Sequence, residues 1–168
     1  MSSFDALAKE ICLNVQEQAR VWQRMLELSL AQLAALGQQD VHAVHAVLQE
    51  IEIAMLDRSR AESRRTVLMA QAASKLDMNV ADITRELIME RCDPATGAEL
   101  SIAADELRAL VVELDSVVAR NTAMLEQELS IIEVLVRGVT VDTSVRTTYG
   151  KQGMQQEAPR LRLLDAQV

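Results

Sequence analysis

The chain has 168 residues, which suits one domain, and its apolar residues are mostly aliphatic because only 2% of all residues are aromatic. Slender aliphatic side chains favour seams between helices over a strand-rich fold, and two prolines and five glycines leave room for long helices. A net charge of −8 argues against nucleic acid as a partner, since nucleic-acid binding needs a basic face.

Apolar residues at helical spacing predict a first helix from about Ser3 to Leu36. The residues that recur every three or four positions on its apolar face are Leu7, Ile11, Val15, Ala19, Trp22, Leu26, Leu30 and Leu33. We expect Gly37 to end this helix in the left-handed conformation and Asp40 to cap the next helix, so that the chain reverses direction. The first two helices would then form a long antiparallel hairpin.

The second helix is expected to end near Leu76, and a short third helix follows it, capped by Asn79 and ending at about Cys92. The apolar stripe of the second helix carries Val41, Val44, Leu48, Ile51 and Met55, and resumes at Met69, Ala72 and Leu76. The apolar face of the third helix carries Val80, Ile83, Leu87 and Ile88.

The fourth helix has the most regular pattern of the chain. Asp93, Pro94 and Gly97 predict a turn before it, and Thr96 with Glu99 has the spacing of a capping box. Steps of four and three, typical of a coiled coil, connect Leu100, Ala104, Leu107, Val111, Leu114, Val118, Asn121, Leu125, Glu128, Ile132, Leu135 and Val139. A second apolar row beside it carries Leu110, Val117, Met124 and Ile131. At a rise of 1.5 Å per residue this helix would reach roughly 60 Å, so part of its stripe should need a partner.

These patterns predict an all-α fold, a bundle or coiled coil, with a helical domain over residues 1–142 and a mobile tail over residues 143–168. Asp5, Lys9 and Glu10 interrupt the apolar run that a secretory signal would need. No stretch reaches the roughly 18 apolar residues of a membrane span. We therefore expect a cytoplasmic protein without membrane insertion.

Few residues offer catalytic or metal-binding chemistry. His42 and His45 share a helical face, but two imidazoles do not complete a zinc site, so we expect them to have a structural or solvent-facing role. Cys12 and Cys92 are too isolated for a disulfide framework and are expected to be small buried thiols. The sequence shows no glycine-rich phosphate loop and no nucleophile with a base nearby. We expect no enzyme, no cofactor and no metal.

The segment from Asp57 to Arg65 contains four arginines in an otherwise acidic chain. Counting back from the predicted turn places it opposite about residues 12–19, where Glu10 and Glu17 would be close enough to pair with it. Arg58 and Glu62 also have the spacing of an ion pair within one helix. We favour a solvated helix face over a docking patch for an acidic partner.

The far half of the fourth helix is the predicted binding surface, a groove for the helix of a partner protein. It carries Leu125, Leu129, Ile132, Leu135 and Val136. The alternative is that these residues close the protein's own bundle, or that the helix pairs with a second copy through Leu114, Val118 and Leu125. That alternative describes a self-associating structural or adaptor protein, and a homodimer.

Two further stretches are distinctive, the run Arg120-Asn121-Thr122-Ala123-Met124-Leu125 and the run Tyr149-Gly150-Lys151-Gln152-Gly153. Both resemble the FlgN family of flagellar export chaperones, and the second is similar to the family's Tyr-Gly-x-x-Gly ending. The order of the helices is similar from about residue 5 to 153. The chain departs from the family at Val118, where the family often has a second asparagine.

This resemblance implies a cytoplasmic chaperone of type III flagellar export. Its clients would be the C-terminal helices of the hook-filament junction proteins FlgK and FlgL, held to prevent premature assembly and delivered to the export gate protein FlhA. Client binding would then use Asn121 together with Leu125, Leu129, Ile132, Leu135 and Val136. Docking on the gate would use Tyr149, Gly150 and Gly153.

Overall fold

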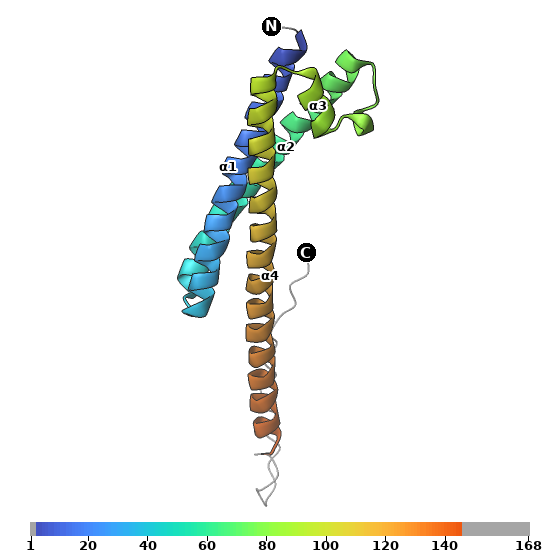
Figure 1. Cartoon of the computed structure of the whole chain (residues 1–168). Coiled ribbons are helices and arrows are strands. Elements are labelled where there is room, and N and C mark those ends of the chain that lie inside the picture. The colour runs from blue at the N-terminus through green and yellow to red at the C-terminus, as the bar shows by residue number, and fades with distance from the viewer. Residues whose placement is uncertain (1–2, 146–168) are drawn as a thin grey trace, which may run out of the picture. The chain divides into compact units, whose positions relative to one another are not determined.

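The computed structural model describes residues 3–145 and the side chains of residues 4–137. The backbone of this range forms α1 (Ser3–Gly37), α2 (Val41–Leu76), a 3-10 turn η1 (Val80–Asp82), α3 (Arg85–Arg91) and α4 (Pro94–Val145), and it contains no strand (Figure 1). The predicted all-α fold, with its long hairpin, short helix and long last helix, is confirmed. The chain divides into two compact units, unit 1 (residues 1–128) and unit 2 (residues 129–168). The predicted domain boundary at residues 142–143 stays a prediction.

The turn between α1 and α2 uses a left-handed residue, but at a different position from the predicted one. Gln39 adopts φ 55°, and its amide donates a hydrogen bond to the carbonyl oxygen of Leu36 at 3.0 Å. The expectation for Gly37 is wrong, because α1 continues through Gly37 and moves the left-handed position along the chain. Asp40 is confirmed as the cap of α2, since its carboxylate accepts a hydrogen bond from the amide of Ala43 at 2.9 Å.

Small side chains on α2 allow α1 to approach closely in the hairpin. The buried residues of α2 are Ala54, Ala61, Leu68, Ala72 and Ala73. In the first half of α2, by contrast, three residues of the predicted apolar stripe are exposed, namely Val41, Leu48 and Met55. The stripe was therefore wrong at these three positions, whereas Val44 and Ile51 are half-buried and Ala54 is the buried residue of this half.

Buried amides add polar contacts to the seam between α1 and α2, and none of them was predicted. The side-chain nitrogen of Asn14 donates to the carbonyl oxygen of Ala61 at 3.1 Å. Gln18 donates in turn to the side-chain oxygen of Asn14 at 2.9 Å. A buried amide is costly unless it is hydrogen-bonded, so this chain of contacts favours one register of the two helices.

The caps of the two later helices differ from the predicted ones. Asn79 precedes only the turn η1 and makes no side-chain capping bond, so the start predicted there for the third helix is wrong. The chain is extended at Thr84, whose hydroxyl accepts a hydrogen bond from the amide of Leu87 at 3.2 Å and caps α3. The third helix does end where expected, with Cys92 as its C-cap.

The start of α4 lies before the predicted capping box. Asp93 caps the helix, because its carboxylate accepts a hydrogen bond from the amide of Thr96 at 3.0 Å. Pro94 suits the first helical position, where an amide hydrogen is not needed. Thr96 and Gly97 lie inside the helix and are buried, so the capping box of Thr96 with Glu99 and the turn at Gly97 are wrong.

The core of unit 1 consists of two apolar clusters, both built on α1. The first joins Leu7, Ala8, Ile11 and Cys12 of α1 with Leu68 and Ala72 of α2, Ile88 of α3 and Leu100 of α4. The second joins Ala19 and Leu26 of α1 with Leu110, Leu114 and Val117 of α4. In unit 1, α1 therefore packs against the other three helices, which explains why α1 has buried residues on more than one face.

The face of α4 that packs in unit 1 is shifted from the predicted seam. Leu100, Leu114 and Asn121 of the first predicted row are buried together with Leu110 and Val117 of the second, whereas Val118 and Leu125 of the first row are exposed. Leu114 is also buried in the second cluster. Of the three residues of the alternative pairing with a second copy, Leu114 is taken up by the protein's own core, while Val118 and Leu125 stay exposed, and the homodimer stays a prediction.

Candidate functional site

Asn121 is held inside unit 1, where α4 packs against α1. Its side-chain nitrogen donates to the carbonyl oxygen of Ser29 at 2.9 Å and to the side-chain oxygen of Gln32 at 2.8 Å. The residue is 3% exposed, and its side-chain oxygen is buried without a hydrogen-bond partner in the described part of the chain. The amide thus ties two helices together, and a contact of Asn121 with a client stays a prediction.

The described helical residues of unit 2 expose their apolar side chains. The exposed fractions are 61% for Leu129, 53% for Ile132, 62% for Leu135 and 57% for Val136. Ile131 and Val134 are exposed as well, so large apolar residues occur on more than one side of this helix. Helices that are apolar on several sides are normally covered by other protein, and large exposed apolar patches usually mark interaction surfaces.

The remaining predicted site residues are divided between the two units. Leu125 belongs to unit 1 and is 40% exposed on α4. Tyr149, Gly150 and Gly153 lie outside the described residues. Their predicted role in docking on an export gate therefore stays a prediction.

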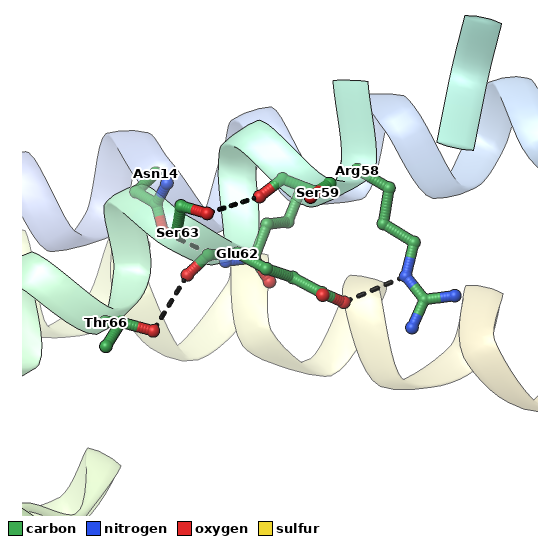
Figure 2. A network of polar contacts seen from close by, with 7 residues as sticks. Asn14, Arg58, Ser59, Glu62, Ser63 and Thr66 are labelled. Atoms are coloured by element: carbon green, nitrogen blue, oxygen red, sulfur yellow. Dashed lines mark hydrogen bonds and ion pairs between the residues drawn. The ribbon is translucent and has the colours of Figure 1, made fainter. Parts of the chain in front are cut away.

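Figure 2 shows that the arginine-rich part of α2 makes hydrogen bonds along its own helix. The Nε atom of Arg58 donates to a carboxylate oxygen of Glu62 at 2.8 Å, which confirms the predicted pair. The hydroxyl groups of Ser63 and Thr66 donate to backbone carbonyl oxygens one turn earlier. In the same stretch, Asn14 of α1 reaches the backbone of α2 (Figure 2).

The same arginines also contact α1, opposite the residues that the sequence predicted. Arg64 lies 3.5 Å from the carboxylate of Glu17, which confirms one predicted pair, while no ion pair among residues 4–137 includes Glu10. The guanidinium of Arg58 lies 4.7 Å from the centre of the Trp22 ring. Because these side chains are largely exposed, such contacts stabilise the hairpin only weakly. They agree with a solvated helix face.

The described residues show no group of three or more His, Cys, Asp and Glu side chains that could hold a metal ion. His42 and His45 are exposed on α2. Cys12 is buried and Cys92 half-buried, and both thiols are free. Burial raises the pKa of both thiols, and nearby carboxylates, Glu99 for Cys12 and Asp93 for Cys92, raise it further. No helix in the described range is long and apolar enough to cross a membrane.

Unit 1 contains a groove of about 350 Å³ that the sequence did not predict. Its apolar lining is Ile11, Val15, Met69, Ile83, Ile88, Leu100, Ala104 and Leu107, and its polar lining is Gln18, Arg65, Arg85, Glu86 and Arg108. These residues come from α1, α2, α3, α4 and the segment before α3. Spacing along one helix could not predict the groove, because no single element carries more than a few of its residues.

A protein-family model described as "FlgN protein" matches residues 1–157, nearly the whole chain. The matched range includes unit 1, the exposed apolar helix of unit 2 and the Tyr149–Gly153 stretch. The sequence matches no curated protein and no solved structure.

Proposed function

The chain belongs to the FlgN family of flagellar export chaperones, whose model covers residues 1–157, and from this premise we propose that its clients are the hook-filament junction proteins FlgK and FlgL. The chaperone holds the C-terminal helices of these clients in the cytoplasm, prevents their premature assembly and delivers them to the export gate protein FlhA.

The observation that carries this proposal is the exposure of Leu129, Ile132 and Leu135 on the helix of unit 2. Because these side chains are 53–62% exposed, full burial of each one by a partner would stabilise the complex by roughly 1–2 kcal/mol, a fraction of the value for a fully exposed side chain. Leu129, Ile132 and Leu135 follow one another at intervals of three positions, so neighbouring members of this set face the same side of the helix. An amphipathic client helix lying along this side would bury its own apolar face at the same time.

This mode of binding explains how a chaperone without an enzymatic reaction blocks early assembly. In this proposal, the surfaces through which the clients assemble are themselves apolar and helical. Two clients that meet through these surfaces polymerise. Occupying that surface with unit 2 removes it from both water and other clients. Release of the client then requires only that the export gate competes for the complex of chaperone and client.

Delivery is assigned to Tyr149, Gly150 and Gly153, which resemble the family's tail motif. A tyrosine adds a large contact area while losing few rotatable bonds, which suits a single anchor in a docking segment. The two glycines permit backbone conformations that other residues adopt only with strain.

The proposal is tested by calorimetry with the full chain and synthetic C-terminal peptides of FlgK and FlgL. We expect binding to at least one peptide, with a negative heat-capacity change because apolar surface is buried. Absence of binding to both peptides would remove these clients from the proposal while leaving the family assignment in place. A chaperone of this family with other export clients would then be the function to test.

A further inference from the structure

The groove of unit 1 combines an apolar lining with an excess of positive charge. Its charged lining residues are three arginines, Arg65, Arg85 and Arg108, against one carboxylate, Glu86. The whole chain, in contrast, has a net charge of −8. A local positive groove in an acidic protein favours an acidic ligand at short range, where contacts within about 10 Å are screened least.

One of the three arginines is already neutralised by the fold. Arg85 of α3 lies 2.7 Å from a carboxylate oxygen of Asp105 on α4 and 3.3 Å from Glu86. These contacts raise the pKa of Arg85, since a hydrogen bond to Asp105 stabilises its charged form. Arg85 therefore joins α3 to α4 at the groove and leaves little charge to offer a ligand.

The other two arginines are uncommitted within the described residues. Arg65 on α2 and Arg108 on α4 are exposed, and the guanidinium group of neither takes part in an ion pair or a hydrogen bond among residues 4–137. They stand on two different helices, while α1 contributes Ile11 and Val15 to the lining. A ligand between α2 and α4 would thus be within reach of a guanidinium from each of these helices and of the apolar lining residues.

We propose that this groove binds an acidic amphipathic helix of a partner protein. The apolar side chains of that helix contact Met69, Ile83 and Leu107, and its carboxylates pair with Arg65 and Arg108. A volume of about 350 Å³ admits a few side chains of a helix and not the whole helix. The partner helix therefore lies across the opening and inserts residues three and four positions apart. This site lies wholly in unit 1 and does not depend on client binding by unit 2.

The test uses the full chain and three synthetic helix-forming peptides with identical leucine spacing. Their polar positions carry glutamate in one peptide, glutamine in the second and lysine in the third. Fluorescence anisotropy should show that the glutamate peptide binds, that added salt weakens this binding, and that the other two peptides bind at least roughly fivefold more weakly. Equal affinities for the glutamate and glutamine peptides would overturn the proposal.

Two arginine variants locate the contact. The double substitution of Arg65→Gln and Arg108→Gln should weaken binding of the glutamate peptide by roughly five- to tenfold, because each exposed pair is worth a factor of a few. The matched control is Arg91→Gln, an exposed arginine of α3 outside the groove lining, which should leave affinity unchanged. In the unsubstituted protein, the methyl NMR signal of Met69 should shift on titration while that of Met55, exposed on the first half of α2, stays in place.

Two other occupants of the groove would overturn the proposal if they were found. Self-association that the double arginine variant abolishes would assign the groove to a second copy of the chain. Tighter binding of a synthetic peptide of residues 146–168 than of the glutamate peptide would assign it to the chain's own C-terminal segment. Light scattering measures the first outcome and anisotropy the second.

Discussion

The side-chain nitrogen of Asn121 lies 2.9 Å from the carbonyl oxygen of Ser29, which precedes it by 92 residues, and this contact ties α4 to α1. The asparagine is buried, and its own oxygen has no hydrogen-bond partner in the described range. A half-satisfied buried amide favours one alignment of the two helices at a cost in stability. The placement shows a contact within the chain, while the predicted contact of Asn121 with a client stays a prediction.

The first prediction therefore concerns Asn121→Ala. Loss of the hydrogen bonds to Ser29 and Gln32, and the small cavity left behind, should lower the free energy of unfolding by about 1–3 kcal/mol. Urea denaturation followed by circular dichroism measures this change. The control is Thr122→Ala at the exposed neighbouring position, which should stay within about 0.5 kcal/mol. Unchanged stability combined with lost client binding would instead identify Asn121 as a direct client contact.

A second prediction tests the close approach of α1 and α2. Ala61 is 3% exposed, so Ala61→Leu forces extra atoms into the seam and should lower the free energy of unfolding by about 1–3 kcal/mol. Ala70→Leu makes the same change at an exposed position of the same helix and serves as its control. Urea midpoints of the two variants should differ clearly. Equal midpoints would mean that the two helices can separate to admit the leucine.

These two sites also show what the sequence could and could not predict. The ends of α1 and α2 followed from the spacing of large apolar residues and from the cap at Asp40. The face of α2 was harder, since alanine is compatible with both buried and exposed helix positions and the contact at Ala61 depends on α1. Asn14 was missed for a related reason, because only the folded hairpin brings its amide to the α2 backbone.

The local caps show a second limit, because several residues compete for each role. Thr84, not Asn79, caps α3, and Asp93, not Thr96, caps α4. Each of these side chains is a good capping group by type. The choice depends on where tertiary contacts begin the helix, which the sequence pattern alone does not specify. The exposed apolar residues of unit 2 were predictable as a pattern, whereas their role as a site still rests on the proposed client.

A third prediction concerns the pH dependence of stability that arises from Asp93, the cap of α4. Hydrogen bonds from the backbone amide and the hydroxyl of Thr96 lower the pKa of this carboxyl group in the folded protein. A lowered folded-state pKa adds stability above the pKa of a free aspartate, and that stability is lost as the pH falls through the folded-state value. Asp93→Asn keeps a side-chain oxygen that can cap the helix but removes the carboxyl group that titrates. Urea midpoints of the two proteins should therefore converge as the pH is lowered, and parallel curves would contradict the prediction.

A fourth prediction separates delivery from client binding. Tyr149→Ala should weaken binding of the loaded complex to the cytoplasmic domain of FlhA, because it removes the aromatic anchor of the proposed docking segment. Affinity for the client peptides should stay the same. Surface plasmon resonance on immobilised FlhA measures the first effect and calorimetry the second, with Tyr149→Phe as the conservative control. Equal loss of both activities in Tyr149→Ala would contradict separate surfaces for clients and gate.

The last prediction concerns the apolar surface of unit 2. Ile132 is 53% exposed in the free chain, so Ile132→Asp should leave the fold intact. In a complex, the new carboxylate would be buried against an apolar client helix without a partner charge, which is strongly unfavourable. Affinity for the client peptides should therefore fall at least about thirtyfold, the scale of losing one central anchor residue.

Ile102→Asp is the matched control for this change, because Ile102 is 70% exposed on the same helix but lies in unit 1. Its client affinity should equal that of the unsubstituted chain, and circular dichroism should show both variants to be folded. Equal losses in the two variants would mean that negative charge anywhere on α4 repels the client. Retained affinity in Ile132→Asp would instead place the client away from Ile132, on a surface whose apolar contacts do not include the exposed helix of unit 2.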